Sequence, residues 1–352
     1  MLVLAGVAWG TGGLLGSLLG RETGLTPLAV AAYRLGLGGL LVLVAVVGLT
    51  LTGLAPRPAF AGARHRRPAL LRIGLLAVLA AAFQACYFTA VSLTSVGLAT
   101  LVTIGTAPVV VVAVETLRGR ARRRSLPVVV LALLGLGLLV GLPVTGADPL
   151  AAAAGAAAAV VAGSCFAVMT LTGSRPIPGL DPMVATGASF VAGGLLLAVP
   201  AAVLGTMAFT MTFSGVGLLA LFAVLPTALA YTAYFRGLGA TTSPGTGAVL
   251  ALLEPLTAAA LAAVVLGERL GVTGTVGALL LAVAVLLAAR ADPVAQPRCL
   301  PSGSAGDALT APRDVDRRIN RASAARSAAG VDRRREAIGG GGSGGPERRF
   351  QS

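Results

Sequence analysis

The chain has 352 residues, of which 56% are hydrophobic and 11% charged, and its formal net charge is +14. It contains no lysine, which excludes a lysine-dependent phosphate loop and a lysine Schiff base. One histidine and three cysteines leave little room for histidine catalysis, a metal site or a disulfide framework. We therefore expect no enzyme activity, no cofactor, no metal and no nucleic-acid partner, but a polytopic membrane protein in contact with the lipid bilayer.

Long apolar blocks, rather than amphipathic ones, run along the first 290 residues and predict an all-α fold. No basic segment precedes the first block, so we expect no cleavable signal peptide. The blocks predict ten transmembrane helices, near 2–19, 27–52, 69–91, 96–117, 126–143, 149–171, 182–204, 214–235, 242–266 and 271–289.

Arginine residues are concentrated in alternate loops. The loop after the second predicted helix carries Arg57, Arg64, Arg66 and Arg67, and the loop after the fourth carries five more between 118 and 124. Because basic loops stay on the cytoplasmic side, both termini are predicted to be cytoplasmic and the chain to lie in the inner (plasma) membrane.

The chain also repeats itself. A Tyr-Phe pair precedes both Pro108 and Pro255 by 21 residues, and Pro27 and Pro182 begin similar apolar blocks. Two five-helix halves result, 1–143 and 149–290. Because five is odd, the second half must cross the membrane in the opposite sense, and inverted repeats place a substrate site at their interface near the midplane.

Glu254 lies near the middle of the ninth predicted helix, about 18 Å from either end. An intramembrane carboxyl is costly and is a candidate functional group, although a hydrogen-bonded structural carboxyl is the alternative. Pro255 removes a helical hydrogen bond and is expected to free the carbonyl near residue 251 and to break the helix there. We expect Glu254 to contact a cationic or amine-bearing small molecule and to exchange a proton for it.

The two halves resemble the paired modules of the EamA-type branch of the drug/metabolite transporter superfamily. The likeness rests on Trp9-Gly10, Arg34, the helix of Pro108, Glu254-Pro255 and the sequence Gly267-Glu268-Arg269, and it covers about 1–290. The resemblance implies ten helices and movement of small metabolites, often export of amino acids or drugs, without ATP. In the first half Ala107 stands where the second half has Glu254, so carboxylate chemistry rests on the second half.

The other candidate site residues are Arg34, Trp9 and Tyr33. Arg34 either contacts substrate or extends to the membrane interface, and the two aromatic residues either line a cavity or pack in the core. Glu115 is interpreted as an interfacial counter-ion. The overlapping GxxxG spacings between Gly6 and Gly20 indicate helix contact rather than a nucleotide loop.

The composition changes after Arg290 to Pro, Ser, Gly, Asp and Arg, which predicts a disordered, basic cytoplasmic tail over 291–352. Two other functions remain open: a lipid-carrier flippase, or a non-transporting membrane partner protein. The substrate, the coupling ion, the transport direction and the oligomeric state, a homodimer among the alternatives, do not follow from the sequence.

Overall fold

The computed structural model describes residues 1–54, 63–119, 125–141, 148–175, 177–240, 243–265 and 271–291. Within these ranges the regular elements are all helices. The predicted tail over 291–352 lies outside them, apart from the last residue of the final helix, and so do Glu268 and Arg269. The expectations for those residues stay predictions.

The first half contains five helices: α1 (Leu2–Thr23), α2 (Pro27–Leu51), α3 (Ala63–Leu93), α4 (Val96–Leu117) and α5 (Ser125–Val140). Local signals set their beginnings. Thr26 caps α2 by accepting a hydrogen bond from the Ala29 amide, and Pro27 occupies the first turn, where no amide donor is needed. Ser95 caps α4 in the same way.

The second half has the same order but two interrupted segments. It comprises α6 (Pro149–Gly173), α7 (Pro182–Val203), α8 (Phe213–Ala223), the π-helix η1 (Val224–Leu229), α9 (Ala230–Ala240), α10 (Pro244–Leu250), α11 (Leu253–Val265) and α12 (Val272–Ala291). The span expected at 214–235 is present as Phe213–Leu238, and within it the helix widens into a π-helix around Pro226. The segment expected at 242–266 is divided at Ala251 and Leu252, beside Pro255.

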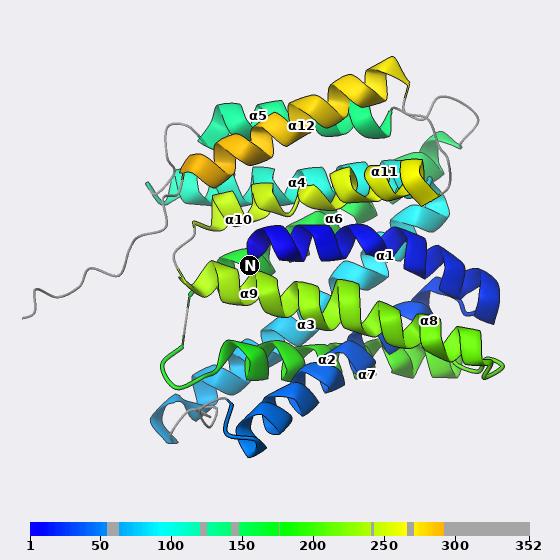
Figure 1. Cartoon of the computed structure of the whole chain (residues 1–352), viewed down its shortest axis with the longest axis vertical. Coiled ribbons are helices and arrows are strands. Elements are labelled where there is room, and N and C mark those ends of the chain that lie inside the picture. The colour runs from blue at the N-terminus through cyan, green and yellow to red at the C-terminus, as the bar shows by residue number, and fades with distance from the viewer. Residues whose placement is uncertain are drawn as a thin grey trace, which may run out of the picture. The chain divides into compact units, whose positions relative to one another are not determined.

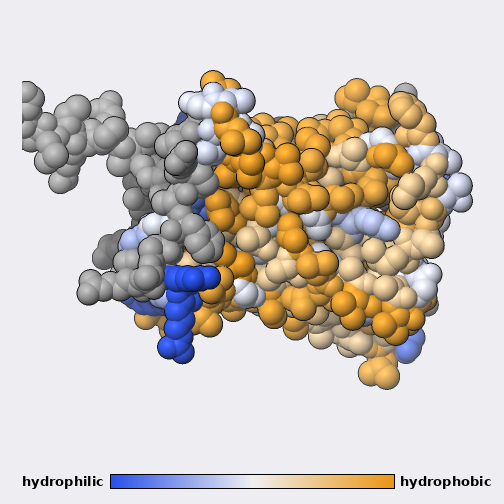
Figure 2. All heavy atoms as spheres, turned by 90° about the horizontal axis from the view of Figure 1, so that it is seen from below, coloured by the Kyte–Doolittle hydropathy of each residue, from blue (hydrophilic) through white to orange (hydrophobic). Residues whose placement is uncertain are grey.

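The described chain has the length and surface of a membrane-spanning bundle. Nine helical segments within it are long and apolar enough to cross a bilayer, and the tenth, Leu126–Val140 in α5, is a shorter apolar helix. Large hydrophobic side chains are exposed along many of these helices. Figure 2 shows hydrophobic residues over most of the visible face, with hydrophilic residues gathered toward two opposite ends. This surface suits lipid, and the prediction of a polytopic membrane protein is confirmed.

Corresponding helices of the two halves pack antiparallel. Gly39 of α2 lies against Val191 of α7, and Gly36 lies against Gly194, so positions rise along one helix as they fall along the other. Pro27 and Pro182, which begin these helices, are 155 residues apart. Adding 155 to Gly36 gives Val191 and to Gly39 gives Gly194, so exchanging the halves exchanges the two contacts.

The remaining contacts follow the same exchange. Helices α5 and α12 form a second antiparallel pair, with Gly135 against Leu281 and Gly277 against Leu139. Helix α6 packs on α3 and α4, and α1 packs correspondingly on the α8–α9 segment and on α11. In Figure 1, α5 and α12 lie together at the top, α2 and α7 at the bottom, and α1 between them. The prediction of two inverted five-helix repeats is confirmed.

Candidate functional site

A cavity of about 640 Å³ lies between the two halves. Its walls come from both: α1 to α5 contribute from the first half and α6 and α8 to α11 from the second. The lining includes the predicted site residues Trp9, Arg34, Glu254 and Pro255, together with Phe83, Gln84, Tyr87, Phe88, Thr100, Thr103, Ile104, Ala107, Phe166, Phe222, Tyr231, Ala248, Ala251, Ala258, Ala259 and Ala262.

The cavity extends from the middle of the bundle toward one face. Its lining continues to the helix ends at Gly20, Leu25, Val91, Gly97 and Val140. All of these lie on the side that holds the connections α1–α2, α3–α4 and α5–α6. The site is therefore reached from this face, which the arginine distribution predicts to be external.

Aromatic rings close the inner end of the cavity. The ring of Trp9 lies 5.7 Å from that of Phe166, 5.0 Å from that of Tyr231 and 4.9 Å from that of Tyr234, measured between centroids. The Tyr234 hydroxyl shares a 2.8 Å hydrogen bond with Thr170. Trp9, Tyr231 and Tyr234 are each less than 5% exposed, so this cluster blocks passage to the other face. Trp9 thus serves both as core and as cavity wall.

Glu254 is held at the break between α10 and α11. The Leu252 amide donates to the Val249 carbonyl at 3.0 Å, and the Glu254 amide donates to the Ala251 carbonyl at 3.0 Å. The expectation that Pro255 leaves the carbonyl near 251 free was therefore wrong, because the tight turn gives that carbonyl a new donor. The predicted break itself is present, and it places Glu254 in the first turn of α11.

Glycines bring α1 against the backbone at this break. A Cβ atom on Gly10 would lie 2.9 Å from the Glu254 carbonyl oxygen, and one on Gly6 would lie 2.9 Å from the Leu250 carbonyl oxygen. Side chains at either position would force the helices apart. The predicted helix contact is correct for these two glycines, and Gly12 and Gly16 meet Pro226 and Phe222, whereas Gly20 lines the cavity with open space beside it.

Arg34 points along the cavity rather than to the membrane interface. Its Nε donates a hydrogen bond to the Thr227 hydroxyl at 3.1 Å, and its Nη2 donates one to the Pro226 carbonyl oxygen at 3.4 Å. The guanidinium also stands over the Phe222 ring, 5.1 Å from its centroid. The π-helix of the second half therefore fixes this cation, and the alternative of extension to the interface is not what the structure shows.

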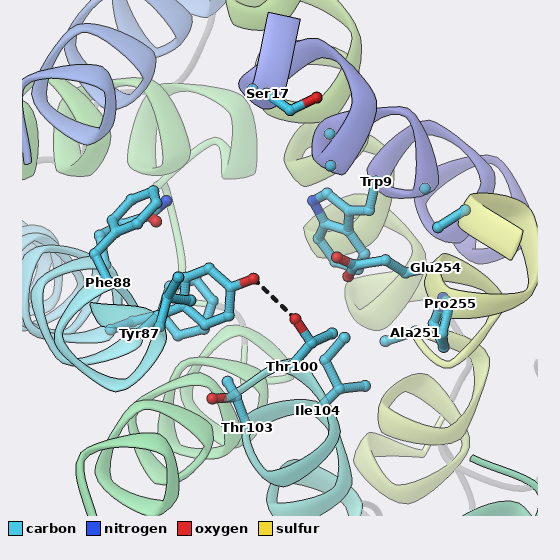
Figure 3. Close-up of a pocket in the computed structure, with 18 of the residues that line it drawn as sticks. Trp9, Ser17, Tyr87, Phe88, Thr100, Thr103, Ile104, Ala251, Glu254 and Pro255 are labelled. Carbon is cyan, nitrogen blue, oxygen red and sulfur yellow. Dashed lines mark hydrogen bonds between the residues drawn. The ribbon is translucent and has the colours of Figure 1, made fainter. Parts of the chain in front are cut away.

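The cavity presents a cation and an acid that do not pair with each other. Arg34 and Glu254 both line it, yet no ion pair joins these two described residues. In Figure 3, Trp9 and Glu254 lie on one side of the cavity and Tyr87 and Phe88 on the other, with Thr100 below them, hydrogen-bonded to Tyr87. Both side chains are thus available to a molecule in the cavity.

Two residues singled out in the sequence lie outside the cavity lining. Tyr33 is absent from the cavity lining; its hydroxyl donates to the Met207 carbonyl at 2.8 Å and its ring packs against Phe209. Glu115 is only 8% exposed, and its carboxylate lies against Gly245 at the beginning of α10. The interpretation of Glu115 as an interfacial counter-ion stays a prediction, because the arginines at 120–124 lie outside the described residues.

Sequence reasoning missed several wall residues, above all Gln84, Tyr231 and the hydrogen-bonded pair of Tyr87 and Thr100. A signal was present in the repeat. Pro108 and Pro255 are 147 residues apart, and the same offset relates Gln84 to Tyr231. Polar residues at equivalent places in two inverted halves are expected on both sides of a central site.

Comparisons with known proteins agree with this architecture. The EamA-like transporter family matches residues 1–141 and 153–290. The chain is 30% identical over 290 residues to the "Uncharacterized transporter YwfM" of Bacillus subtilis (strain 168), which covers 81% of this chain and 91% of that protein. A solved structure titled "Crystal structure of protein" superposes with a TM-score of 0.65 at 19% identity, over 82% of this chain and 95% of that one, and supports the fold alone.

The family match spans most of the chain, and the ten helical segments, the inverted halves and the central cavity fit a membrane transporter. The chain belongs to the EamA-like transporter family, within the drug/metabolite transporter superfamily.

Proposed function

We propose that this protein is a secondary transporter that exports a small amine-bearing solute by alternating access, without ATP. The observation that carries the proposal is the cavity between the two halves, which holds Glu254 and Arg34 without an ion pair between them. Charged groups inside a membrane bundle characteristically mark a substrate or ion pathway.

The two antiparallel helix pairs supply a route between two states. Each pair, α2 with α7 and α5 with α12, joins one helix of each half through close glycine contacts. Exchanging the conformations of two inverted halves converts a cavity open to one face into a cavity open to the other. The aromatic cluster around Trp9 would then separate, while the end of the cavity that is open in this structure would close.

The charges indicate the class of substrate. Glu254 suits a protonated amine, and Arg34 suits a carboxylate, so amines and zwitterionic amino acids both fit the cavity. A proton on Glu254 would compete with a cationic amine for the same carboxylate. Proton exchange at Glu254 therefore couples the movement of the solute to the proton gradient.

The arginine-rich loops support a cytoplasmic position for both termini in the plasma membrane, and with this orientation the cavity opens outward. Reporter fusions test this orientation. Fusions after Arg66 should report a cytoplasmic position, and fusions at Asp148 and Met207 an external one. An external result at Arg66 would reverse the assigned direction of the cavity.

A ligand screen followed by flux tests the function. Purified protein is heated with amines, amino acids, nucleosides and sugars, because a ligand that binds the native state raises its melting temperature by mass action. Compounds that stabilise the protein are then followed into proteoliposomes. Amines or amino acids should bind and cross. Movement of labelled lipid with no movement of any soluble amine would instead identify a flippase and overturn the proposal.

A further inference from the structure

Gln84 is a buried polar side chain in the cavity wall that no protein atom satisfies. It is 1% exposed, and neither its amide oxygen nor its amide nitrogen has a hydrogen-bond partner. An unpaired buried amide lowers stability, because it loses its hydrogen bonds to water and gains none in the protein. Buried polar groups are nearly always paired, so an unpaired one in a cavity wall requires a reason.

Gln84 occupies the face of α3 that looks across the cavity. Tyr87 and Phe88 follow it by three and four residues and therefore share its helical face. Figure 3 shows Tyr87 and Phe88 opposite Trp9 and Glu254. A molecule whose amine sits at Glu254 thus extends toward the wall that carries Gln84.

The surroundings of Gln84 select an uncharged partner. Phe83, Tyr87 and Phe88 lie beside it in the wall, and the charged members of the described lining are Arg34 and Glu254, on other helices. A charge placed at Gln84 would meet no counter-charge among the residues of α3 that line the cavity, whereas an amide would exchange a donor and an acceptor with it. On the facing wall, the indole Nε1 of Trp9 is also without a partner.

We propose that Gln84 is a specificity-determining residue that binds a neutral donor–acceptor group, such as a carboxamide, at the end of the substrate away from its amine. This inference rests on the proposed function, because it takes the amine to be held by Glu254. It narrows the substrate class to solutes that carry both an amine and an uncharged hydrogen-bonding group.

Two benzylamines provide the test: 4-(aminomethyl)benzamide carries a carboxamide, and 4-methylbenzylamine carries a methyl group in its place. Dissociation constants are measured on the full chain in detergent, for the unchanged protein, Gln84→Leu and Glu254→Gln. The unchanged protein should bind the carboxamide about tenfold more tightly, as one good hydrogen bond predicts. Gln84→Leu should remove that preference and leave the affinity for 4-methylbenzylamine within about twofold.

Ser164→Ala is the control. Ser164 lies on α6 outside the cavity lining, and its hydroxyl donates to the Val160 carbonyl at 2.7 Å, so its loss should keep the preference. Melting without ligand gives a second readout. Gln84→Leu should melt no lower than the unchanged protein, because it loses no hydrogen bond, and a clearly lower melting temperature or a failure to fold would overturn the inference.

The outcomes separate the two proposals. Equal affinity for both amines, with both weakened by Glu254→Gln, would keep the proposed function and overturn the role of Gln84. A preference that survives in Gln84→Leu would also overturn it. Failure of both amines to bind the unchanged protein, or binding unaffected by Glu254→Gln, would overturn the proposed function and the inference with it.

Discussion

The two halves of the bundle share a plan but differ where they line the cavity. Helix α4 carries Pro108 and remains one helix from Val96 to Leu117, with Ala107 before the proline. Its counterpart is broken into α10 and α11 and has Glu254 before Pro255. A proline alone therefore does not break the helix. The break coincides with the place where a polar side chain must face the cavity and where Gly6 and Gly10 bring α1 close.

The third helices of the two halves also differ in regularity, and again the helix of the second half is the irregular one. Helix α3 is continuous, whereas its counterpart passes through the π-helix around Pro226 and presents Thr227 to Arg34. At the repeat offset the first half has Ala80 in place of Thr227. Irregular backbone thus gathers in the second half, at the cavity, while the pairs between halves stay regular. The regular helix pairs shared by the two halves form the scaffold, and the segments in which the halves differ line the cavity.

Removing the charge of Glu254 should erase the largest difference between the halves. In Glu254→Gln the shape is kept, but the amine loses its counter-charge, so we expect flux at least about tenfold lower. Binding of a cationic amine to the unchanged protein should weaken as pH falls, because protons compete for the carboxylate, and binding to the variant should not. Both are measured from about pH 5.5 to about pH 8.5. Glu22→Gln, at an exposed site bonded to Ser214, is the control. Normal flux in Glu254→Gln at every pH would make the residue structural.

Separating α1 from the break should have the next largest effect. Gly10→Val would press against Thr257 and the Glu254 carbonyl, and overpacking of this kind costs about 1–3 kcal/mol. We expect a lower melting temperature and strongly reduced flux. Gly13→Ala is the matched control, since a Cβ there meets no atom within 4 Å. Equal melting temperatures for Gly10→Val and Gly13→Ala would show that α1 does not pack as described.

Removing the hydrogen bond between Arg34 and the π-helix should have a moderate effect on transport. The Thr227 hydroxyl accepts from Arg34 at 3.1 Å and donates to the Phe222 carbonyl at 3.1 Å. Thr227→Val keeps the shape and removes both bonds, which should lower the flux of a zwitterionic substrate about fivefold, as the loss of about 1 kcal/mol predicts. Thr186→Val, which loses only a bond to the Pro182 carbonyl in its own helix, should change flux little. A similar loss in both variants would deny Arg34 a role in binding.

The smallest expected effect compares the two prolines directly. Pro255→Ala restores an amide beside Glu254 and favours a continuous helix, so flux should fall about threefold as the break closes. Pro108→Ala lies in a helix that is already continuous and should leave flux within about twofold. Transport rates of the two variants at matched expression decide the point. If the first-half variant loses as much flux as the second, the halves contribute equally and the comparison fails.

The sequence alone was enough to predict membrane insertion, ten spans, their inverted repetition and the family, because each depends on local composition or on matches between segments. A block of apolar residues must lie in lipid whatever its neighbours are, and an odd number of spans inverts the second copy. The predicted limits of α4 coincide with those observed, since a serine cap and an arginine-rich loop mark its ends. Glu254 was found for the same reason: an acid in an apolar span is visible in the sequence.

Only the tertiary structure decided which groups meet. Three contacts join residues more than 100 positions apart: Arg34 with Thr227, Tyr33 with Met207 outside the cavity lining, and Glu115 with Gly245 of α10. Gln84 is the sharpest case. The sequence shows that a polar glutamine lies in an apolar helix. Only the packing of α3 beside the cavity shows that both its amide atoms lack a hydrogen-bond partner and that the residue lines the cavity.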